Sequence, residues 1–533
     1  MTVFFPKNGI EMEAGEGETL LDAIRAAGLP IEALCSGRGA CGKCLVRVDG
    51  ERRLACRTLA ADGQRVEILA SAEGQDILTD SGAASCESRP AGARPAGSEA
   101  AGRAFGAGAA ASGRAAFAID VGTTTVAVKA VDTGSGRELA VRAFTNPQRV
   151  YGADVLSRIN NAMDDASALS GLITDALGAA IKEIACDGAV CPKAVDKVVI
   201  AGNTTMSYLL LGLRCRSLGL APFEPEYALK PSYSYREVFK TDGLDCPVYI
   251  YPYISAFVGG DIVSGLVNIG RHLETGQAPS FMLVDMGTNG EIAYRCGDRL
   301  ITTSTAAGPA LEGGNIACGM SGMDGAVHGV RYEAANGCGG RFSVKTIGGG
   351  PAAGICGSGV IDLMATLLDA GFVSQSGAFT DAALAIAEDT EPAPVLKQLV
   401  IAEADAPAGG ARVVFTQKDV REFQLAKGAI RAGIDILIEE MGEAPAMFYL
   451  AGGFGQNISL ESAFRVGLIP REMRGRIRFV GNTSLGGCVD ACVGGGSDTP
   501  LPSLRAAGAA REINLGAHKS FNGKFMETMM FGE

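Results

Sequence analysis

Residues 117–132 read FAIDVGTTTVAVKAVD, and residues 281–294 read FMLVDMGTNGEIAY. In both stretches an apolar run rich in strand-forming residues ends at Asp-x-Gly-Thr, and a second run follows. The repeat predicts two strand–turn–strand units that form the two halves of one site.

The residue types in these turns suit phosphate and Mg²⁺. Glycine lets backbone N–H groups approach phosphate oxygens closely, and threonine adds hydroxyl donors. The ATP-binding candidates are Gly122, Thr123, Thr124, Thr125, Gly287, Thr288 and Asn289. A carboxylate beside the turn holds hydrated Mg²⁺ or orients an attacking water. The catalytic candidates are Asp120, Asp285 and Glu291. One such turn alone would be equally typical of a plain hairpin.

A third motif follows the apolar run 447–450, where residues 451–455 read AGGFG. The three motifs, in this order, resemble those of the acetate and sugar kinase, Hsp70 and actin superfamily. That resemblance implies an α/β, two-lobed ATPase fold in which the first two turns hold phosphates. It also implies an adenosine-binding segment, made of Gly452, Gly453, Phe454 and Gly455.

Four cysteines near the N-terminus have the spacing of an iron–sulfur site. Cys35, Cys41 and Cys44 lie in a glycine-rich loop, and Cys56 follows a predicted strand at 45–48. Structural zinc also takes four thiolates, but usually from two separated C-x2-C pairs, so the spacing favours a [2Fe-2S] cluster. Residues 1–75 resemble the β-grasp ferredoxins, although only eleven residues separate Cys44 from Cys56.

Composition divides the rest of the chain. Residues 76–115 are rich in Ala, Gly, Ser, Pro and Arg without an apolar period, which predicts a flexible linker. We expect a first lobe at 116–275 and a C-terminal lobe at 276–533. Polar residues at 146–158 and Asn203 are each interpreted as helix caps or as parts of the site.

Whole-chain properties narrow the function classes. The chain has 533 residues, with 47 Lys+Arg against 59 Asp+Glu, and this net charge of -12 disfavours nucleic acid and anionic membranes as partners. No apolar run reaches the ~20 residues of a membrane-spanning helix, and the N-terminus lacks the pattern of a signal sequence. We therefore expect a cytoplasmic protein with no membrane partner, whose cysteines are read for metal rather than for disulfides.

The ordered motifs resemble one family along nearly the whole chain, the reductive activators of corrinoid-dependent enzymes. They include NPQRVYGADVLSRI, AGNTTM, SAFVGGDI, AAGPALEGG and GICGSGVID, besides the three nucleotide motifs and the cysteines. The resemblance implies an ATPase that passes one electron from its [2Fe-2S] cluster to cob(II)alamin in a corrinoid protein. The regenerated cob(I)alamin returns a methyltransferase of anaerobic metabolism to its cycle. An upstream reductant, Mg²⁺ and a homodimer are implied as well.

Two other functions fit parts of this pattern. A small-molecule kinase would fit the nucleotide half, but it leaves the cysteine domain without a role. An ATP-gated electron donor to another low-potential metalloenzyme would fit both halves.

Overall fold

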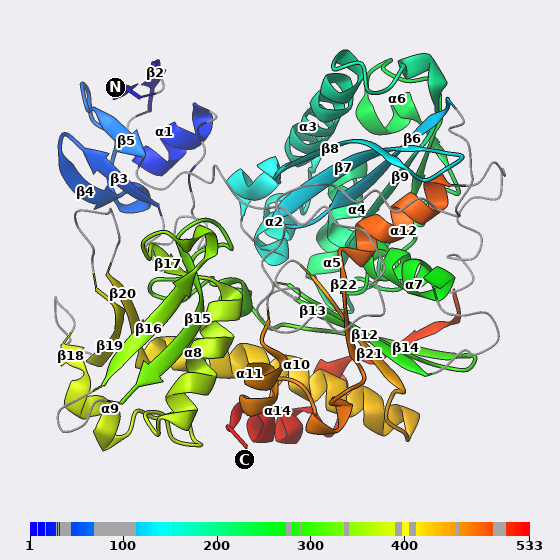
Figure 1. Cartoon of the computed structure of the whole chain (residues 1–533). Helices are drawn as coiled ribbons and strands as arrows, with labels where there is room; N and C mark the ends of the chain where they lie inside the picture. The colour runs from blue at the N-terminus through cyan, green and yellow to red at the C-terminus, as the bar shows by residue number, and fades with distance from the viewer. Residues whose placement is uncertain are drawn as a thin grey trace. The chain divides into compact units, whose positions relative to one another are not determined.

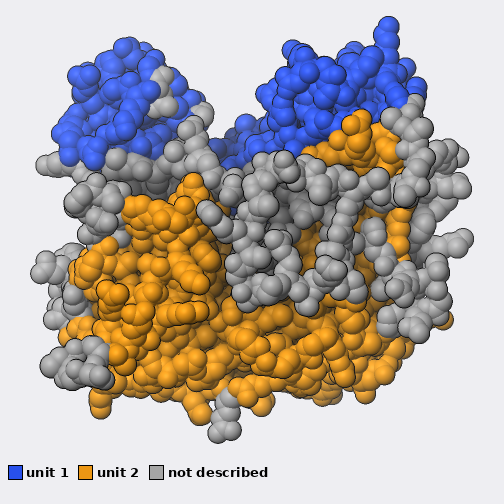
Figure 2. All heavy atoms as spheres, viewed as in Figure 1, with its two compact units in different colours: residues 1–75, 113–130, 139–250 blue, residues 76–112, 131–138, 251–533 orange. Residues whose placement is uncertain are grey.

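The computed structural model (Figure 1) has an α/β architecture with several sheets. It describes residues 1–7, 9–15, 17–27, 29, 31, 44–68, 113–152, 154–272, 280–287, 289–334, 340–389, 397–403, 412–452, 458–493 and 508–532. The predicted linker therefore lies outside the described residues up to position 112. The chain divides into two compact units, 1–75 with 113–130 and 139–250, and 76–112 with 131–138 and 251–533 (Figure 2).

The described residues among the first 68 form a small domain around α1. β1 (Thr2–Phe5) and β2 (Ile10–Glu13) pair antiparallel. α1 (Leu20–Ala26) begins at a capping box between Thr19 and Asp22. β3 (Leu45–Val48) pairs antiparallel with both β4 (Glu51–Leu54) and β5 (Val66–Ile68). The buried face of α1 and these strands share one hydrophobic core.

The first six-stranded sheet carries the first predicted turn. Its order is β10-β11-β9-β6-β7-β8, and β6 runs parallel to β9. The strands are β6 (Ala115–Val121), β7 (Thr125–Asp132), β8 (Glu138–Thr145), β9 (Val195–Gly202), β10 (Tyr233–Ser234) and β11 (Pro247–Ile250). The α-helices that lie between β8 and β11 in the chain are α2 (Val155–Asn161), α3 (Ser167–Cys186), α4 (Thr204–Leu211), α5 (Arg216–Gly219) and α6 (Tyr235–Phe239). β6 is buried along nearly its whole length, so the turn that follows it sits on a rigid strand.

The second six-stranded sheet carries the second predicted turn. Its order is β22-β21-β12-β13-β14-β23, with β12 and β21 parallel. The strands are β12 (Phe281–Met286), β13 (Gly290–Cys296), β14 (Arg299–Thr305), β21 (Met447–Ala451), β22 (Ile477–Gly481) and β23 (Ala510–Glu512). The helices in this unit that pack with these strands or with each other include α7 (Gly260–His272), α10 (Gln417–Met441), α12 (Thr483–Cys492) and α14 (Phe521–Met529). α7 packs on α12, where the Asn268 amide donates to Asp490 at 2.7 Å.

Two three-stranded sheets lie between β14 and α10 in the chain. One contains β15 (Ala326–Glu333), β16 (Arg341–Thr346) and β17 (Gly354–Ile355), with α8 (Gly357–Asp369) packed on β15. The other contains β18 (Glu388–Asp389), β19 (Lys397–Ala402) and β20 (Val413–Thr416), and α9 (Asp381–Ile386) and α11 (Leu460–Arg465) are further short helices of this unit.

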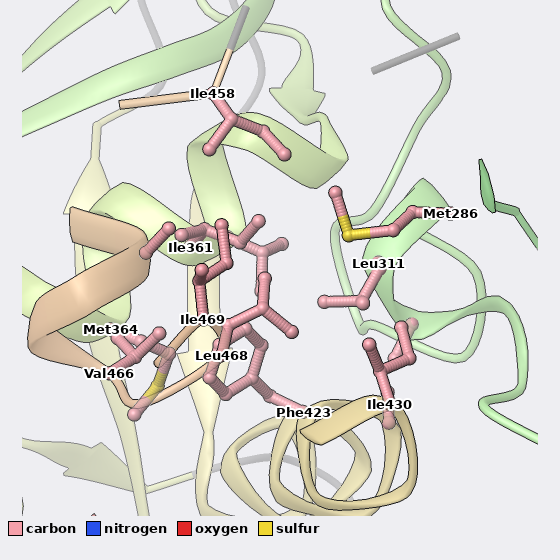
Figure 3. Close-up of a cluster of buried hydrophobic side chains, with 14 of the residues drawn as sticks. Met286, Leu311, Ile361, Met364, Phe423, Ile430, Ile458, Val466, Leu468 and Ile469 are labelled. Carbon is pink, nitrogen blue, oxygen red and sulfur yellow. The ribbon is translucent and has the colours of Figure 1, made fainter. Parts of the chain in front are cut away.

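The long helix α10 provides one side of the core of the second unit. It begins at a capping box between Thr416 and Asp419, and its apolar stripe is fully buried. Figure 3 shows Phe423 and Ile430 of α10 in a cluster with side chains from β12, α8 and the segments around them. Met286, the last residue of β12, belongs to this cluster, so the second turn is anchored to the core.

Candidate functional site

Two of the four predicted cluster ligands, Cys44 and Cys56, lie close together in the N-terminal domain. The β3–β4 hairpin aligns Leu45 with Leu54, and the Ala55 N–H donates to the Cys44 carbonyl at 2.8 Å. The Cys44 and Cys56 sulfurs are consequently 3.2 Å apart. Both side chains are buried, and the separation is well above the ~2.0 Å of a disulfide.

Two cysteine side chains converging in a buried position are a suitable half of a four-cysteine cluster site. Cys35 and Cys41, the other two predicted ligands, lie outside the described residues. The two described cysteines therefore suit the predicted [2Fe-2S] cluster, for which Cys44 and Cys56 are two of the four predicted ligands.

The first Asp-x-Gly-Thr turn closes tightly. Asp120 lies beside Ala201 of β9, and the Gly122 N–H donates to the Thr125 carbonyl at 3.0 Å. A Cβ atom on Gly122 would lie 2.7 Å from that same carbonyl oxygen, which is too close for any other residue. Thr124 is exposed at the tip. The glycine is thus required by the turn itself.

Three polar side chains hold this turn from other parts of the first unit. The Asn146 amide donates to the Gly122 carbonyl at 2.8 Å, and the Arg158 guanidinium donates to the Thr123 carbonyl at 2.6 Å. The Asn203 amide donates to the Thr123 hydroxyl at 3.0 Å.

Residues of the segment 146–158 and Asn203 cap helices and also contact the first turn. Asn203 caps α4 by accepting from the Met206 N–H at 2.9 Å, and it contacts the turn with its other amide atom. Asp154 caps α2, and Arg158 on that helix reaches the turn. Arg158 falls within the segment 146–158, but its contact with the turn could not be predicted, because the carbonyl that it reaches lies 35 positions away.

The second turn is built on the antiparallel pair β12 and β13. The Gly287 N–H donates to the Asn289 carbonyl at 2.9 Å, and Asp285 lies directly opposite Glu291 in the strand register. Unlike Gly122, Gly287 has room for a Cβ, whose nearest neighbour would be a Glu312 carboxylate oxygen at 3.5 Å. Thr288 lies outside the described residues.

Carboxylates surround this second turn. Glu291 is only 9% exposed, and its burial raises the pKa of its carboxyl well above the usual range. The nearby charges of Asp261 and then Asp285 raise that pKa further. Asp261, in the first turn of α7, was not predicted as a site residue, although the SAFVGGDI motif contains it. Among the described residues no three acidic, histidine or cysteine side chains form a ready metal-binding group.

The start of the predicted adenosine segment lies beside the second turn. Because β21 runs parallel to β12, Ala451 is in register with Asp285. Gly452 has a positive φ of 101°, and a Cβ there would lie 2.6 Å from the Met286 carbonyl and 3.0 Å from the Asp285 carboxylate. Gly453, Phe454 and Gly455 lie outside the described residues. The fold thus joins two of the three motifs across 167 positions of sequence.

The glycines of GICGSG have a packing role. A Cβ on Gly357 would lie 1.7 Å from the Leu311 carbonyl, and one on Gly359 would lie 2.0 Å from the Val327 carbonyl. These contacts fix the start of α8 against its neighbours.

Three family models match successive parts of the chain. A model for a 2Fe-2S iron-sulfur cluster binding domain matches residues 1–70, one for the RACo middle region matches residues 115–274, and one for the C-terminal ASKHA domain of RACo matches residues 280–533. The described helices include none with the length and hydrophobicity needed to span a membrane.

Similar proteins cover the same span. The corrinoid activation enzyme RamQ of Eubacterium limosum is 28% identical over 100% of this chain and 99% of its own. A reductase of a methylated amine-specific Co(II) corrinoid protein from Methanosarcina barkeri is 28% identical over 55% of this chain and 54% of its own. Among solved structures, a reductive activator for a corrinoid, iron-sulfur protein matches with a TM-score of 0.68 and 26% identity, covering 99% of this chain and 98% of that one.

Proposed function

Because this chain belongs to the RACo family of reductive activators, we propose that it uses ATP to drive one electron from its [2Fe-2S] cluster to cob(II)alamin of a corrinoid protein. The cob(I)alamin so formed restores a methyltransferase to its cycle. The observation that carries this proposal is the whole-length similarity to a corrinoid activation enzyme, which includes the cysteine domain as well as the ATPase domain.

Each part of the chain has a role in the proposal. Residues 1–75 hold the cluster through Cys35, Cys41, Cys44 and Cys56, and residues 76–115 tether this domain. Residues 116–275 and 276–533 form the two lobes, whose turns bind the phosphates of one Mg-ATP. Asp120, Asp285 and Glu291 serve the hydrolysis of ATP. The protein acts in the cytoplasm as a homodimer and receives its electron from an upstream reductant.

The need for ATP follows from energetics. A plant-type [2Fe-2S] centre supplies an electron at about -400 mV, and moving one electron ~100 mV uphill costs ~2.3 kcal/mol. A ligand changes such an equilibrium only if it binds two states of the protein with different affinity. The two lobes of an ASKHA domain offer two such states, open and closed on nucleotide.

Anaerobic absorbance spectroscopy tests the proposal. A corrinoid protein loaded with cob(II)alamin is mixed with this protein and with a reductant too weak to act alone, with and without Mg-ATP. We expect the cob(I)alamin band to rise only with Mg-ATP. No rise, with the cluster intact, would reject the corrinoid protein as the acceptor, and phosphate transfer to a small molecule would indicate a kinase instead.

Variants of the cysteines separate electron delivery from nucleotide binding. Cys41→Ala is expected to abolish cobalt reduction and to leave Mg-ATP binding within about twofold of the unaltered protein. Cys186→Ala is the matched control, since Cys186 is an exposed thiol at the end of α3. Cobalt reduction that survives Cys41→Ala would show that the cluster is not the donor.

A further inference from the structure

Arg158 carries a charge although its side chain is fully buried, where a charge loses its hydration. The side chain is 0% exposed, and its guanidinium donates to the Thr123 carbonyl at 2.6 Å, the Gly152 carbonyl at 2.9 Å and the Met206 sulfur at 3.3 Å. All three acceptors are uncharged. Within the described part of the chain, no carboxylate accepts a hydrogen bond from Arg158.

The acidic side chain whose charge raises the pKa of Arg158 makes its own hydrogen bonds to another residue. The Asp154 carboxylate accepts from the N–H and the hydroxyl of Ser157, each at 2.8 Å, as the cap of α2. Burial lowers the pKa of Arg158 to about 10, which Asp154 raises and Arg149 lowers by smaller amounts. The group therefore stays charged at neutral pH. A buried cation without a paired anion destabilises the fold, so a function must account for its presence.

The carbonyl groups of the first turn accept hydrogen bonds from Arg158 and from other groups around the turn. The carbonyls of four successive residues, 122–125, all accept hydrogen bonds from within the first unit. The donors, in order, are the Asn146 side chain, Arg158, the Asn146 N–H at 2.9 Å and the Gly122 N–H. Among the described residues, neither the N–H of Thr123 nor that of Thr124 has an acceptor. Successive backbone N–H groups left free in this way form an anion-binding site.

We propose that Arg158 is a positioning residue of the nucleotide site, which acts through the Thr123 carbonyl and whose buried charge is compensated when phosphate binds to the free N–H groups of the first turn. This inference rests on the proposed function, because it takes the first turn as a phosphate site. It goes further because it assigns the preference for phosphate to the charge of Arg158, which α2 holds behind the turn.

Comparison of Mg-ATP with adenosine tests the inference. Affinities of the full-length protein for both ligands are measured by calorimetry. Arg158→Met keeps the length of the side chain and removes its charge, so we expect Mg-ATP affinity to fall by about tenfold or more and adenosine affinity to change by less than about threefold. Arg158→Lys keeps the charge and is expected to retain most of the difference between the two ligands. Arg236→Met, an exposed arginine on α6, is the matched control.

A second variant covers the case in which Arg158→Met does not fold. Asn203→Asp preserves the cap of α4, since aspartate caps helices as well as asparagine does. It places a negative charge next to the Thr123 hydroxyl, so the same selective loss of Mg-ATP affinity is expected.

The outcomes are distinguishable. Equal losses for Mg-ATP and adenosine would mean that Arg158 only holds the loop, and unchanged affinities would mean that its charge does not reach the ligand; both overturn the inference and leave the proposed function standing. If the unaltered protein bound Mg-ATP no better than adenosine, the phosphate role of the turn would be wrong, and the proposed function would fail together with the inference.

Discussion

The turn at 120–125 is backed by a buried guanidinium and two amides, whereas the turn at 285–289 is surrounded by carboxylates. Arg158 donates to the first turn, while the charges of Asp261 and Asp285 act on Glu291 beside the second. The Asp-x-Gly-Thr motif is the same in both. The motif thus places a turn at the end of each strand, although the two turns close differently, and residues from elsewhere determine the charge around each turn.

The difference suggests a division of labour. Free N–H groups with a cation behind them favour phosphate oxygens. At the second turn, burial and the charges of Asp261 and Asp285 raise the pKa of the Glu291 carboxyl, and a carboxyl with a raised pKa suits the transfer of a proton. Under the proposed function, the first turn is the one expected to bind phosphate, and the second is the one whose carboxyls are expected to take part in proton transfer.

The largest effect is expected from removing the charge of Asp285. Asp285→Asn should lower the rate of ATP-driven cobalt reduction by about 10²–10³, because one electrostatic stabiliser of a transition state is typically worth that much. Asp120→Asn should cost about tenfold less, since Arg158 remains behind its turn. Steady-state rates measure both, with the exposed Asp298→Asn as control. Equal losses of rate in the Asp120 and Asp285 variants would contradict the different roles assigned to the two turns.

Substitution of Gly122 and of Gly287 tests whether the first turn is packed more tightly than the second. Gly122→Ala places a Cβ 2.7 Å from the Thr125 carbonyl, whereas the nearest atom at Gly287 would be 3.5 Å away. We expect Gly122→Ala to lower the free energy of unfolding by about 1–3 kcal/mol and Gly287→Ala to change it by less than about 0.5 kcal/mol. Chemical denaturation measures both. A larger loss at Gly287 would show that the second turn is the tighter one.

The smallest effect concerns the proton on Glu291. Its pKa is raised in the folded protein above the ordinary value of 4.5, first by burial and then by Asp261 and Asp285. The folded state therefore keeps a proton that the unfolded state releases, and the contribution of Glu291 to stability is present below pH 4.5 and is lost as pH rises through the raised pKa.

Glu291→Gln should remove this dependence. Above pH 4.5 the unfolding free energy of the unaltered protein should fall with pH more steeply than that of the variant, by up to about 1.4 kcal/mol per pH unit. Denaturation at several pH values, without nucleotide or Mg²⁺, measures the slopes. Parallel slopes would mean that Glu291 is ionised in the folded protein and that the second turn carries more negative charge than the structure indicates.

Much of the local structure could be predicted from the sequence. The strand at 45–48 and the strands leading into both turns are confirmed. The fold class is confirmed as well, with an iron–sulfur domain and an ASKHA domain. Such features depend on short-range patterns, namely turn residues, apolar periods and caps that satisfy the backbone within a few positions.

Long-range electrostatics could not be predicted in this way. Lys427 of α10 illustrates the point. Its spacing from Phe423 and Ile430 places it on the apolar face of the helix, but nothing in the sequence indicates that its ammonium donates to the Met530 carbonyl at 2.6 Å. Arg158 and Asp261 are similar cases, with partners far away in the sequence. Their burial and their neighbours depend on how helices and strands pack.

By itself the sequence determined which segments form strands, turns and helices, which cysteines can ligate a cluster, and which family the chain resembles. Only the tertiary structure decided that Arg158 lies behind the first turn and that Asp261, Asp285 and Glu291 gather at the second. The physical reason is the distance along the chain over which each kind of interaction acts. Backbone conformation is set by interactions within a few residues, whereas the energy of a charge depends on burial and on distances to groups that packing brings from anywhere in the chain.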